Sequence, residues 1–140
     1  MNNLKILLVE DNIHDVAFIQ AALSNSSFTS AVHVVNDGLE CVDLLNKTGK
    51  HSNAITPDII ILDLNMPILD GIEVLKKIKQ DPSHRKIPII VFTSSKDAID
   101  ISNAYDNYVN SYVVKPMDPQ QYENVIKEIE KFWMTISEIP

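Results

Sequence analysis

The chain has 140 residues, an apolar fraction of 45% and a net charge of −7. A chain of this length typically folds as one domain with a sizeable core. The negative charge and the lack of clustered Lys and Arg exclude nucleic acid as an expected partner, because phosphate contacts need basic patches. No apolar run approaches the roughly 20 residues of a membrane span, so no membrane insertion is expected.

The start of the chain and its one cysteine indicate the cytoplasm. A strand pattern begins within the first ten positions, which leaves no room for a signal peptide. Cys41 has no partner for an intramolecular disulfide and suits a reducing compartment. It shares a helical pattern with Val42 and Leu45, which predicts a packed thiol. We therefore expect a cytoplasmic protein.

Short apolar runs recur along the chain. Each is too short for a helix, and most lack polar alternation. This pattern is typical of strands that are buried on both faces of a parallel sheet. The five expected strands are Lys5–Val9, Ala31–Val35, Asp58–Leu62, Pro88–Phe92 and Ser111–Val114.

Apolar residues at helical spacing separate and follow these strands. The first helix is expected over Ile13–Ser24, and a polar surface loop over Asn46–Pro57. The last helix has the clearest stripe and starts at Asp118-Pro119, a cap followed by a first-turn proline. The apolar positions of the second helix are Leu39, Val42 and Leu45, and those of the third are Ile72, Leu75 and Ile78. The fourth has Ala98, Ile101, Ala104 or Tyr105, and Tyr108. The stripe of the last helix consists of Tyr122, Val125, Ile126, Ile129, Phe132, Trp133 and Ile136.

Five strand–helix units in series predict an α/β fold with right-handed crossovers and helices on both faces of the sheet. The expected arrangement is a doubly wound, five-stranded parallel sheet of flavodoxin-like order 2-1-3-4-5. Residues 1–140 are expected to form this single domain, with a short C-terminal helical tail and no output domain. Ligands of such sheets bind at the carboxyl ends of the strands, near the switch point between strands 1 and 3.

Reactive side chains stand at four of the predicted strand ends. Glu10 and Asp11 follow the first strand, Asp63 follows the third, and Thr93 and Lys115 close the fourth and fifth. Three carboxylates brought together repel one another, which raises a pKa or requires a cation. Oxygen ligands favour a hard divalent ion, and Mg²⁺ fits because it keeps waters and pairs with phosphate.

A carboxylate, a divalent ion, an ammonium and a hydroxyl are the parts that accept a phosphoryl group. The carboxylate attacks as a nucleophile and gives an aspartyl phosphate. The metal and the lysine neutralise charge on the equatorial oxygens. Each of these residues alone is commonly a surface or loop residue. Their register at neighbouring strand ends predicts a single site.

These motifs resemble those of response-regulator receiver domains of two-component signalling, over about residues 4–133. The resemblance rests on Glu10-Asp11, Asp63 with Met66-Pro67 and Asp70-Gly71, Thr93-Ser94, and Lys115-Pro116. It implies that Asp63 is the phosphoacceptor, that Thr93 hydrogen-bonds the phosphoryl group and that Lys115 pairs with it.

The resemblance also implies a set of Mg²⁺ ligands. Asp11 and Asp63 would bind the ion directly, and Asn65 would bind through its backbone carbonyl. Glu10 stands where most receivers have an aspartate and reaches one methylene further, so it would act mainly through water.

Two further residues are implied in the activation switch. Pro116 would follow Lys115 through a cis peptide bond, which is essentially a property of X-Pro bonds. Tyr112 matches the aromatic residue whose exposure changes on activation. From the residues alone, Tyr112 is equally well a packed aromatic at the start of a strand.

A narrower resemblance is to the small stand-alone regulators of bacterial, especially cyanobacterial, phytochrome kinases. It implies a homodimer through the face of the fourth and fifth helices and the tail. The residues that carry it are Glu10-Asp11, the loop before Thr56-Pro57-Asp58, Tyr108–Tyr112 and Phe132–Met134. The possible dimer residues are Tyr105, Tyr108, Phe132 and Trp133, although the last two also fit a core stripe.

The implied function is a phosphorylation-dependent switch. A sensor histidine kinase, phytochrome-type on the narrower resemblance, donates a phosphoryl group to Asp63, and the protein signals through changed contacts with an unidentified downstream protein. Slow autodephosphorylation would reset it without making it a turnover enzyme.

Two other functions fit the same fold. An aspartyl-intermediate phosphohydrolase would need a second acid two residues after Asp63, where Asn65 stands. A flavin-binding electron carrier would need a hydroxyl-rich phosphate loop after the first strand, where the chain has Glu10, Asp11 and Asn12.

Overall fold

In the computed structural model, which describes residues 3–140, five parallel strands form one sheet in the order β2-β1-β3-β4-β5. This confirms the predicted doubly wound architecture. The strands are β1 (Leu4–Val9), β2 (Ser30–Val35), β3 (Ile59–Leu62), β4 (Ile89–Thr93) and β5 (Ser111–Val114). The helices are α1 (Ile13–Ser24), α2 (Gly38–Asn46), α3 (Gly71–Gln80), α4 (Ala98–Asp106) and α5 (Tyr122–Lys131).

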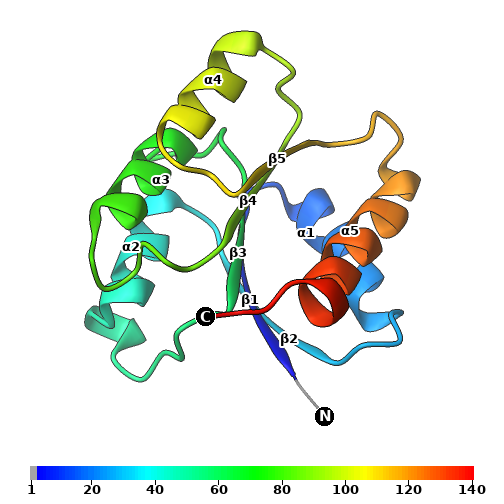
Figure 1. The fold of residues 1–140 in the computed structure, drawn as a ribbon, viewed down its shortest axis with the longest axis horizontal. Coiled ribbons are helices and arrows are strands. Elements are labelled where there is room, and N and C mark those ends of the chain that lie inside the picture. The colour runs from blue at the N-terminus through cyan, green and yellow to red at the C-terminus, as the bar shows by residue number, and fades with distance from the viewer. Residues whose placement is uncertain (1–2) are drawn as a thin grey trace.

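Helices cover both faces of the sheet. Figure 1 shows α1 and α5 on one face and α2, α3 and α4 on the other. Two apolar clusters result. Leu7, Ile60 and Leu75 belong to the cluster under α2 and α3, and Ile61 and Ile126 belong to the one under α1 and α5. No helix within residues 3–140 is long and apolar enough to cross a membrane.

Burial follows position in the sheet. All residues of the central strands β3 and β4 are buried, as expected for strands covered on both faces. The edge strand β2 alternates between partly buried and exposed residues up to Val34 and ends at the buried Val35. Every residue of the other edge strand, β5, is only partly buried. The continuous apolar runs of the sequence therefore mark the centre of the sheet.

Two of the predicted helical faces need correction. In α2 the buried residues are Gly38, Cys41, Leu44 and Leu45, whereas Leu39 is 48% exposed. The helix begins after its cap at Asp37, which turns Leu39 to solvent. The burial of Cys41 confirms the predicted packed thiol. In α4 the prediction is right only for Ala104, the one buried residue of this helix.

The end of the chain packs partly on the core. Asp118 caps a short 3₁₀ turn (Pro119–Gln121) by accepting from the backbone N–H of Gln120, and this turn leads into α5. A π-helical turn, Phe132–Ile136, follows α5. Trp133 packs against the α1/α5 cluster, but Phe132 is 44% exposed and Ile136 is 70% exposed. The predicted core stripe therefore includes Trp133 but not Phe132 or Ile136.

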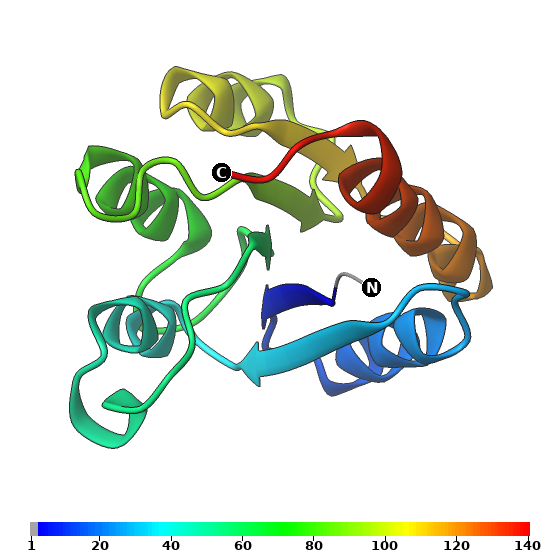
Figure 2. The ribbon, with the colours of Figure 1, turned by 60° about the horizontal axis from the view of Figure 1, so that its bottom comes forward.

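The connection from α2 to β3 is not entirely a surface loop. It contains a 3₁₀ turn, Gly49–His51, and the His51 side chain is buried. Figure 2 shows this connection beside α2, at the edge of the sheet that β2 forms.

Candidate functional site

Two buried carboxylates meet at the switch point of the sheet. Glu10 directly follows β1 and Asp63 directly follows β3, and their side chains are buried. The backbone N–H of Asp63 donates to the carbonyl of Val9 at 3.0 Å, which joins the two strand ends. Asp11 is exposed at the rim. Carboxylate oxygens of Glu10, Asp11 and Asp63 all lie within 4.8 Å of one another.

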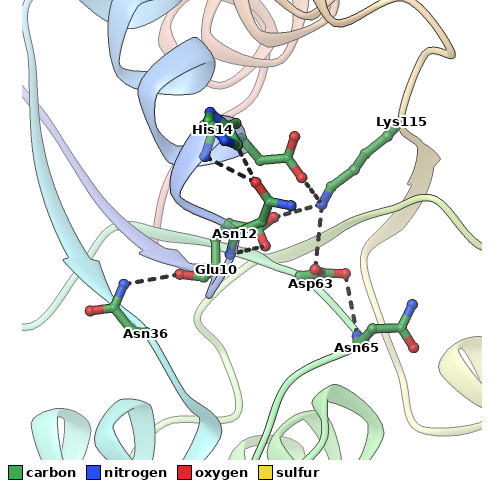
Figure 3. Close-up of polar contacts among 8 residues, drawn as sticks. Glu10, Asn12, His14, Asn36, Asp63, Asn65 and Lys115 are labelled. Atoms are coloured by element: carbon green, nitrogen blue, oxygen red, sulfur yellow. Dashed lines mark hydrogen bonds and ion pairs between the residues drawn. The ribbon is translucent and has the colours of Figure 1, made fainter.

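Lys115 provides the positive charge among these carboxylates. Its Nζ lies 2.7 Å from Oε1 of Glu10 and 3.4 Å from Oδ2 of Asp63, as Figure 3 shows. A third carboxylate, that of Asp15, lies 2.8 Å away. Burial opposes the charged ammonium, but the bonds to Asp15 and Glu10 and the charge of Asp63 outweigh burial and raise the pKa of Lys115.

The groups around Glu10 shift its pKa in opposite directions. Burial, followed by the charge of Asp63, raises the pKa of Glu10 to about 7, and the nearby Lys115 ammonium offsets this only in part. A divalent cation would relieve both causes, because it replaces water as a ligand and neutralises Asp63. The single ammonium of Lys115 therefore does not fully neutralise Glu10 and Asp63.

Thr93 carries an unused hydroxyl at the end of β4. The residue is fully buried, and its Oγ1 has no hydrogen-bond partner within residues 3–140. A buried hydroxyl without a partner costs free energy, about 1–3 kcal/mol. An oxygen placed at the ends of β3 and β4 would remove that cost.

The donor set fits a hard divalent cation. The three clustered side chains offer only oxygens, and Asp11 leaves the site open to solvent. The exposed Asn65 donates its backbone N–H to Oδ1 of Asp63 at 3.3 Å, which keeps its chain segment beside the carboxylate.

Local bonds hold the first strand end in place. Asn12 caps α1 through Oδ1 and donates its own N–H to Oε2 of Glu10 at 3.2 Å. Asn36 donates from Nδ2 to the carbonyl of Glu10 at 3.2 Å. These bonds aim Glu10 inward, and nothing in the sequence pattern indicated Asn36.

Gly71 lets α3 approach the end of β3. A Cβ added at Gly71 would lie 2.4 Å from the carbonyl oxygen of Asp63 and 2.5 Å from Cα of Leu64. The N–H of Gly71 donates to the Leu64 carbonyl at 2.9 Å. The Asp70-Gly71 pair of the sequence is thus a helix cap followed by a close backbone contact.

Tyr112 is tied to the loop after β4. Its hydroxyl donates to the carbonyl of Ser95 at 2.9 Å, and the residue is partly buried against the α2/α3 cluster. The Ser95 hydroxyl in turn lies 2.5 Å from Oδ2 of Asp100. Tyr112 is therefore both a packed aromatic and a contact of the loop that follows Thr93.

The predicted cis bond before Pro116 is wrong for this structure, in which no peptide bond of residues 3–140 is cis. Lys115 reaches the carboxylates with a trans bond after it, and its backbone N–H pairs with the carbonyl of Thr93 at 2.7 Å. The intrinsic preference between the two isomers of an X-Pro bond is small, so sequence alone decides it poorly.

Asp15 is a residue of the site that sequence reasoning missed. It lies in the first turn of α1, shortly after the cap residue Asn12. An acidic residue is common in the first turn of a helix, so nothing in the sequence marked Asp15 as part of the site. Of the side chains predicted at the strand ends, the structure brings together those of Glu10, Asp11, Asp63 and Lys115.

The residues expected at a dimer face are mostly exposed. Tyr105 is 50% and Tyr108 77% exposed, and Tyr108 lies beyond the end of α4 with a φ of 65°. Phe132 and Trp133 pack edge to face, with ring centroids 5.2 Å apart. Both line a groove of about 770 Å³ between β5 and α5.

A family comparison agrees with this site. The model of the response regulator receiver domain matches residues 6–127. The chain belongs to this family, and it is a phosphorylation-dependent signalling protein of the two-component type. Receiver domains work with sensor histidine kinases.

Individual relatives are more specific. The response regulator Rcp1 of Synechocystis sp. is 36% identical over 135 residues, which covers 96% of this chain and 92% of Rcp1. Chemotaxis protein CheY1 of Helicobacter pylori is 31% identical, with coverage of 89% and 92%.

Solved structures agree over nearly the whole chain. The phosphorylated cyanobacterial phytochrome response regulator RcpA has a TM-score of 0.96 and 42% identity, and covers 99% of both chains. The Mn²⁺-bound form of Rcp1 has a TM-score of 0.92 and 35% identity, with 97% and 98% coverage. The predicted family and the predicted similarity to phytochrome regulators are thereby confirmed.

Proposed function

We propose that Asp63 is the phosphoacceptor. A carboxylate oxygen of Asp63 forms the bond to phosphorus while the P–N bond of a kinase phosphohistidine breaks, and the electron pair of that bond stays on the imidazole nitrogen. The observation that carries this proposal is the buried carboxylate of Asp63 with Lys115 Nζ at 3.4 Å. The neighbouring strand β4 ends at Thr93, whose hydroxyl has no partner within residues 3–140.

Mg²⁺ is the proposed cofactor. Asp11, Asp63 and the backbone carbonyl of Asn65 would hold it directly, and Glu10 mainly through water. When bound, it neutralises charge on the phosphoryl oxygens. The clustered carboxylates and the raised pKa of Glu10, caused by burial and by Asp63, support a divalent cation here.

The proposed switch runs through the ends of β4 and β5. A phosphoryl oxygen accepts from Thr93 and pairs with Lys115, which draws the loop after β4 toward Asp63. The same loop carries Ser95, whose carbonyl accepts a hydrogen bond from Tyr112. Movement of the loop therefore changes the surroundings of Tyr112. Pro116, next to Lys115, passes the change to the start of α5.

The proposed output is protein binding. Residues 1–140 act as one receiver unit with its helical tail, in the cytoplasm, and not as a turnover enzyme. Asn65, rather than a second acid, stands two residues after Asp63 and gives no general base for fast hydrolysis. Autodephosphorylation is slow and resets the signal.

The proposed partners are a phytochrome-type histidine kinase and a second copy of the chain. The kinase proposal is supported by the 42% identity to the phytochrome response regulator RcpA. The homodimer proposal is supported by the exposed aromatic residues Tyr105, Tyr108 and Phe132, beside Trp133. A downstream protein would use the same α4–β5–α5 face.

Acetyl phosphate labelling tests this function. We expect Mg²⁺-dependent incorporation of one phosphoryl group, abolished by Asp63→Asn. A phytochrome-type kinase should transfer label faster than an unrelated kinase at equal concentration. Full labelling of the Asp63→Asn protein would refute the proposal.

A further inference from the structure

Lys115 is held by more carboxylates than the proposed reaction uses. Its Nζ contacts Glu10 at 2.7 Å, Asp15 at 2.8 Å and Asp63 at 3.4 Å. Asp63 receives the phosphoryl group and Glu10 faces the metal. Asp15 has neither role, yet its distance to Lys115 is nearly as short as that of Glu10 and shorter than that of Asp63.

Asp15 is the partner of Lys115 that a metal leaves free. Within residues 3–140, the carboxylates close enough together to share an ion are Glu10, Asp11 and Asp63. A cation bound there competes with the ammonium for Glu10 and Asp63, because both positive charges need the same oxygens. The bond from Lys115 to Asp15 does not compete with the cation and persists when it binds.

Lys115 needs such an anchor. A lysine side chain has four rotatable bonds and about 2 kcal/mol of rotamer entropy to lose. Once the metal draws Glu10 and Asp63 away, little else would keep the ammonium beside the acceptor. The ion pair with Asp15 is well shielded, since the side chains of Lys115 and Asp15 are only 5% and 15% exposed.

Asp15 itself sits on rigid structure. Its backbone N–H donates to the capping Oδ1 of Asn12 at 3.1 Å, in the first turn of α1. Burial, followed by the negative charge of Asp15, raises the pKa of Tyr122 at the start of α5 to about 12. Tyr122 is buried and packs edge-on against Phe92 at 5.3 Å between centroids.

We propose that Asp15 is a positioning residue, which holds the ammonium of Lys115 beside Asp63 while a divalent cation occupies the site. The proposal rests on the proposed role of Asp63 as phosphoacceptor. Asp15 acts only through Lys115 and touches neither the cation nor the phosphoryl group.

A double-mutant cycle separates this role from a general effect of charge. The four proteins are wild type, Asp15→Asn, Lys115→Met and the double variant, each treated with acetyl phosphate at saturating Mg²⁺. We expect Asp15→Asn to slow labelling roughly tenfold when Lys115 is present, because a reacting group is misplaced. With Met at position 115, the same change should alter the rate less than about twofold, since no ammonium remains to be placed.

Mg²⁺ affinity gives a readout that does not depend on phosphorylation. Without Asp15 the ammonium rests on Glu10 and Asp63, so Mg²⁺ binding, measured by titration of thermal stability, should weaken several-fold. When position 115 is Met, Asp15→Asn should weaken Mg²⁺ binding no more than the control change Glu138→Gln does. Glu138 is exposed near Lys5 and Asp58, at the opposite end of the sheet.

Two further variants of Asp15 complete the test. Asp15→Glu keeps the charge and should retain most of the rate, whereas Asp15→Ala removes the charge and should slow labelling roughly tenfold only with Lys115 present. If Asp15→Asn does not fold, these two variants decide the question. Equal effects of the Asp15 changes in both backgrounds, or a wild-type rate in Asp15→Asn, would overturn the proposal. Label in Asp63→Asn would instead refute the phosphoacceptor.

Discussion

Nζ of Lys115 lies 2.7 Å from Oε1 of Glu10, although the two residues are 105 positions apart in the chain. They follow β5 and β1, which are separated in the sheet by β3 and β4. A long side chain from the edge strand therefore crosses the ends of two strands to reach the switch point. The same ammonium lies 3.4 Å from Oδ2 of Asp63, so one positive charge serves both buried carboxylates.

Stability without metal should fall as pH rises from about 4.5 to 7. The pKa of Glu10 is raised to about 7 in the folded protein by burial and by Asp63, from 4.5 in the unfolded chain. The folded state then binds more protons in this window, so the stability present below pH 4.5 is lost as pH rises through 7.

Thermal unfolding in chelator at several pH values measures this effect. The difference between wild type and Glu10→Gln isolates Glu10 from other titrating groups, and this difference should change across the window. Mg²⁺ should stabilise more at pH 8 than at pH 5.5, because its ligands must be deprotonated. A Mg²⁺ shift independent of pH would contradict the assignment.

Gly71→Ala should damage both the fold and the site. The new Cβ meets the Asp63 carbonyl at 2.4 Å and Leu64 Cα at 2.5 Å, and backbone atoms cannot move aside cheaply. We expect a loss of about 1–3 kcal/mol in the free energy of unfolding. Asp70→Ala, which removes only the adjacent cap, should cost about 1 kcal/mol and leave labelling of Asp63 near normal. Urea unfolding and acetyl phosphate labelling measure the two effects.

Lys79→Met should destabilise the end of the sheet opposite the site. Nζ of Lys79 donates to the carbonyls of Arg85 and Ile87 and to Oδ1 of Asn110, at 3.0, 2.9 and 3.1 Å. Without this ammonium, oxygen acceptors from two loops lose their hydrogen-bond donor. We expect the free energy of unfolding to fall by about 1–3 kcal/mol. The matched control is Lys77→Met, an exposed lysine on the same helix, whose effect should stay within about 0.5 kcal/mol.

Cys41 should be unreactive while the protein is folded. The thiol is fully buried, and burial raises its pKa to about 12, so the reactive thiolate is scarce at neutral pH. A chromogenic disulfide reagent should modify Cys41 slowly in buffer and rapidly in denaturing urea. Fast modification of the native protein would show that α2 opens readily.

The dimer proposal predicts a mass near twice the monomer in sedimentation. Phe132→Glu places a charge on the exposed aromatic face and should shift the protein toward monomer. Phe18→Glu, on a partly exposed aromatic residue of α1, controls for a new charge elsewhere. A monomer at high concentration in both phosphorylation states would remove the proposal.

The sequence predicted the sheet well because its signal is local. Ile59–Leu62 and Ile89–Thr93 are continuous apolar runs, and only a strand covered on both faces buries every residue of such a run. The reactive residues then follow from position, since parallel strands bring Asp63 and Lys115 to one edge. Predicting that these residues lie at one site required only the order of the strands in the sheet.

The missed features do not show in the local pattern of apolar residues. The 48% exposure of Leu39 depends on where α2 starts, which the Asp37 cap decides. The bond from Asp15 to Lys115 joins residues 100 positions apart. Neither of these is encoded in a local apolar period.

Peptide mapping by mass spectrometry most directly tests the role of Asp63. The protein is treated with acetyl phosphate and Mg²⁺, and borohydride then reduces the acyl phosphate to an alcohol that survives digestion. We expect the reduced residue at position 63 and a loss of the product when Mg²⁺ is chelated. Reduction at Asp11 or Glu10 instead, with Asp63 unmodified, would contradict the assignment of the phosphoacceptor.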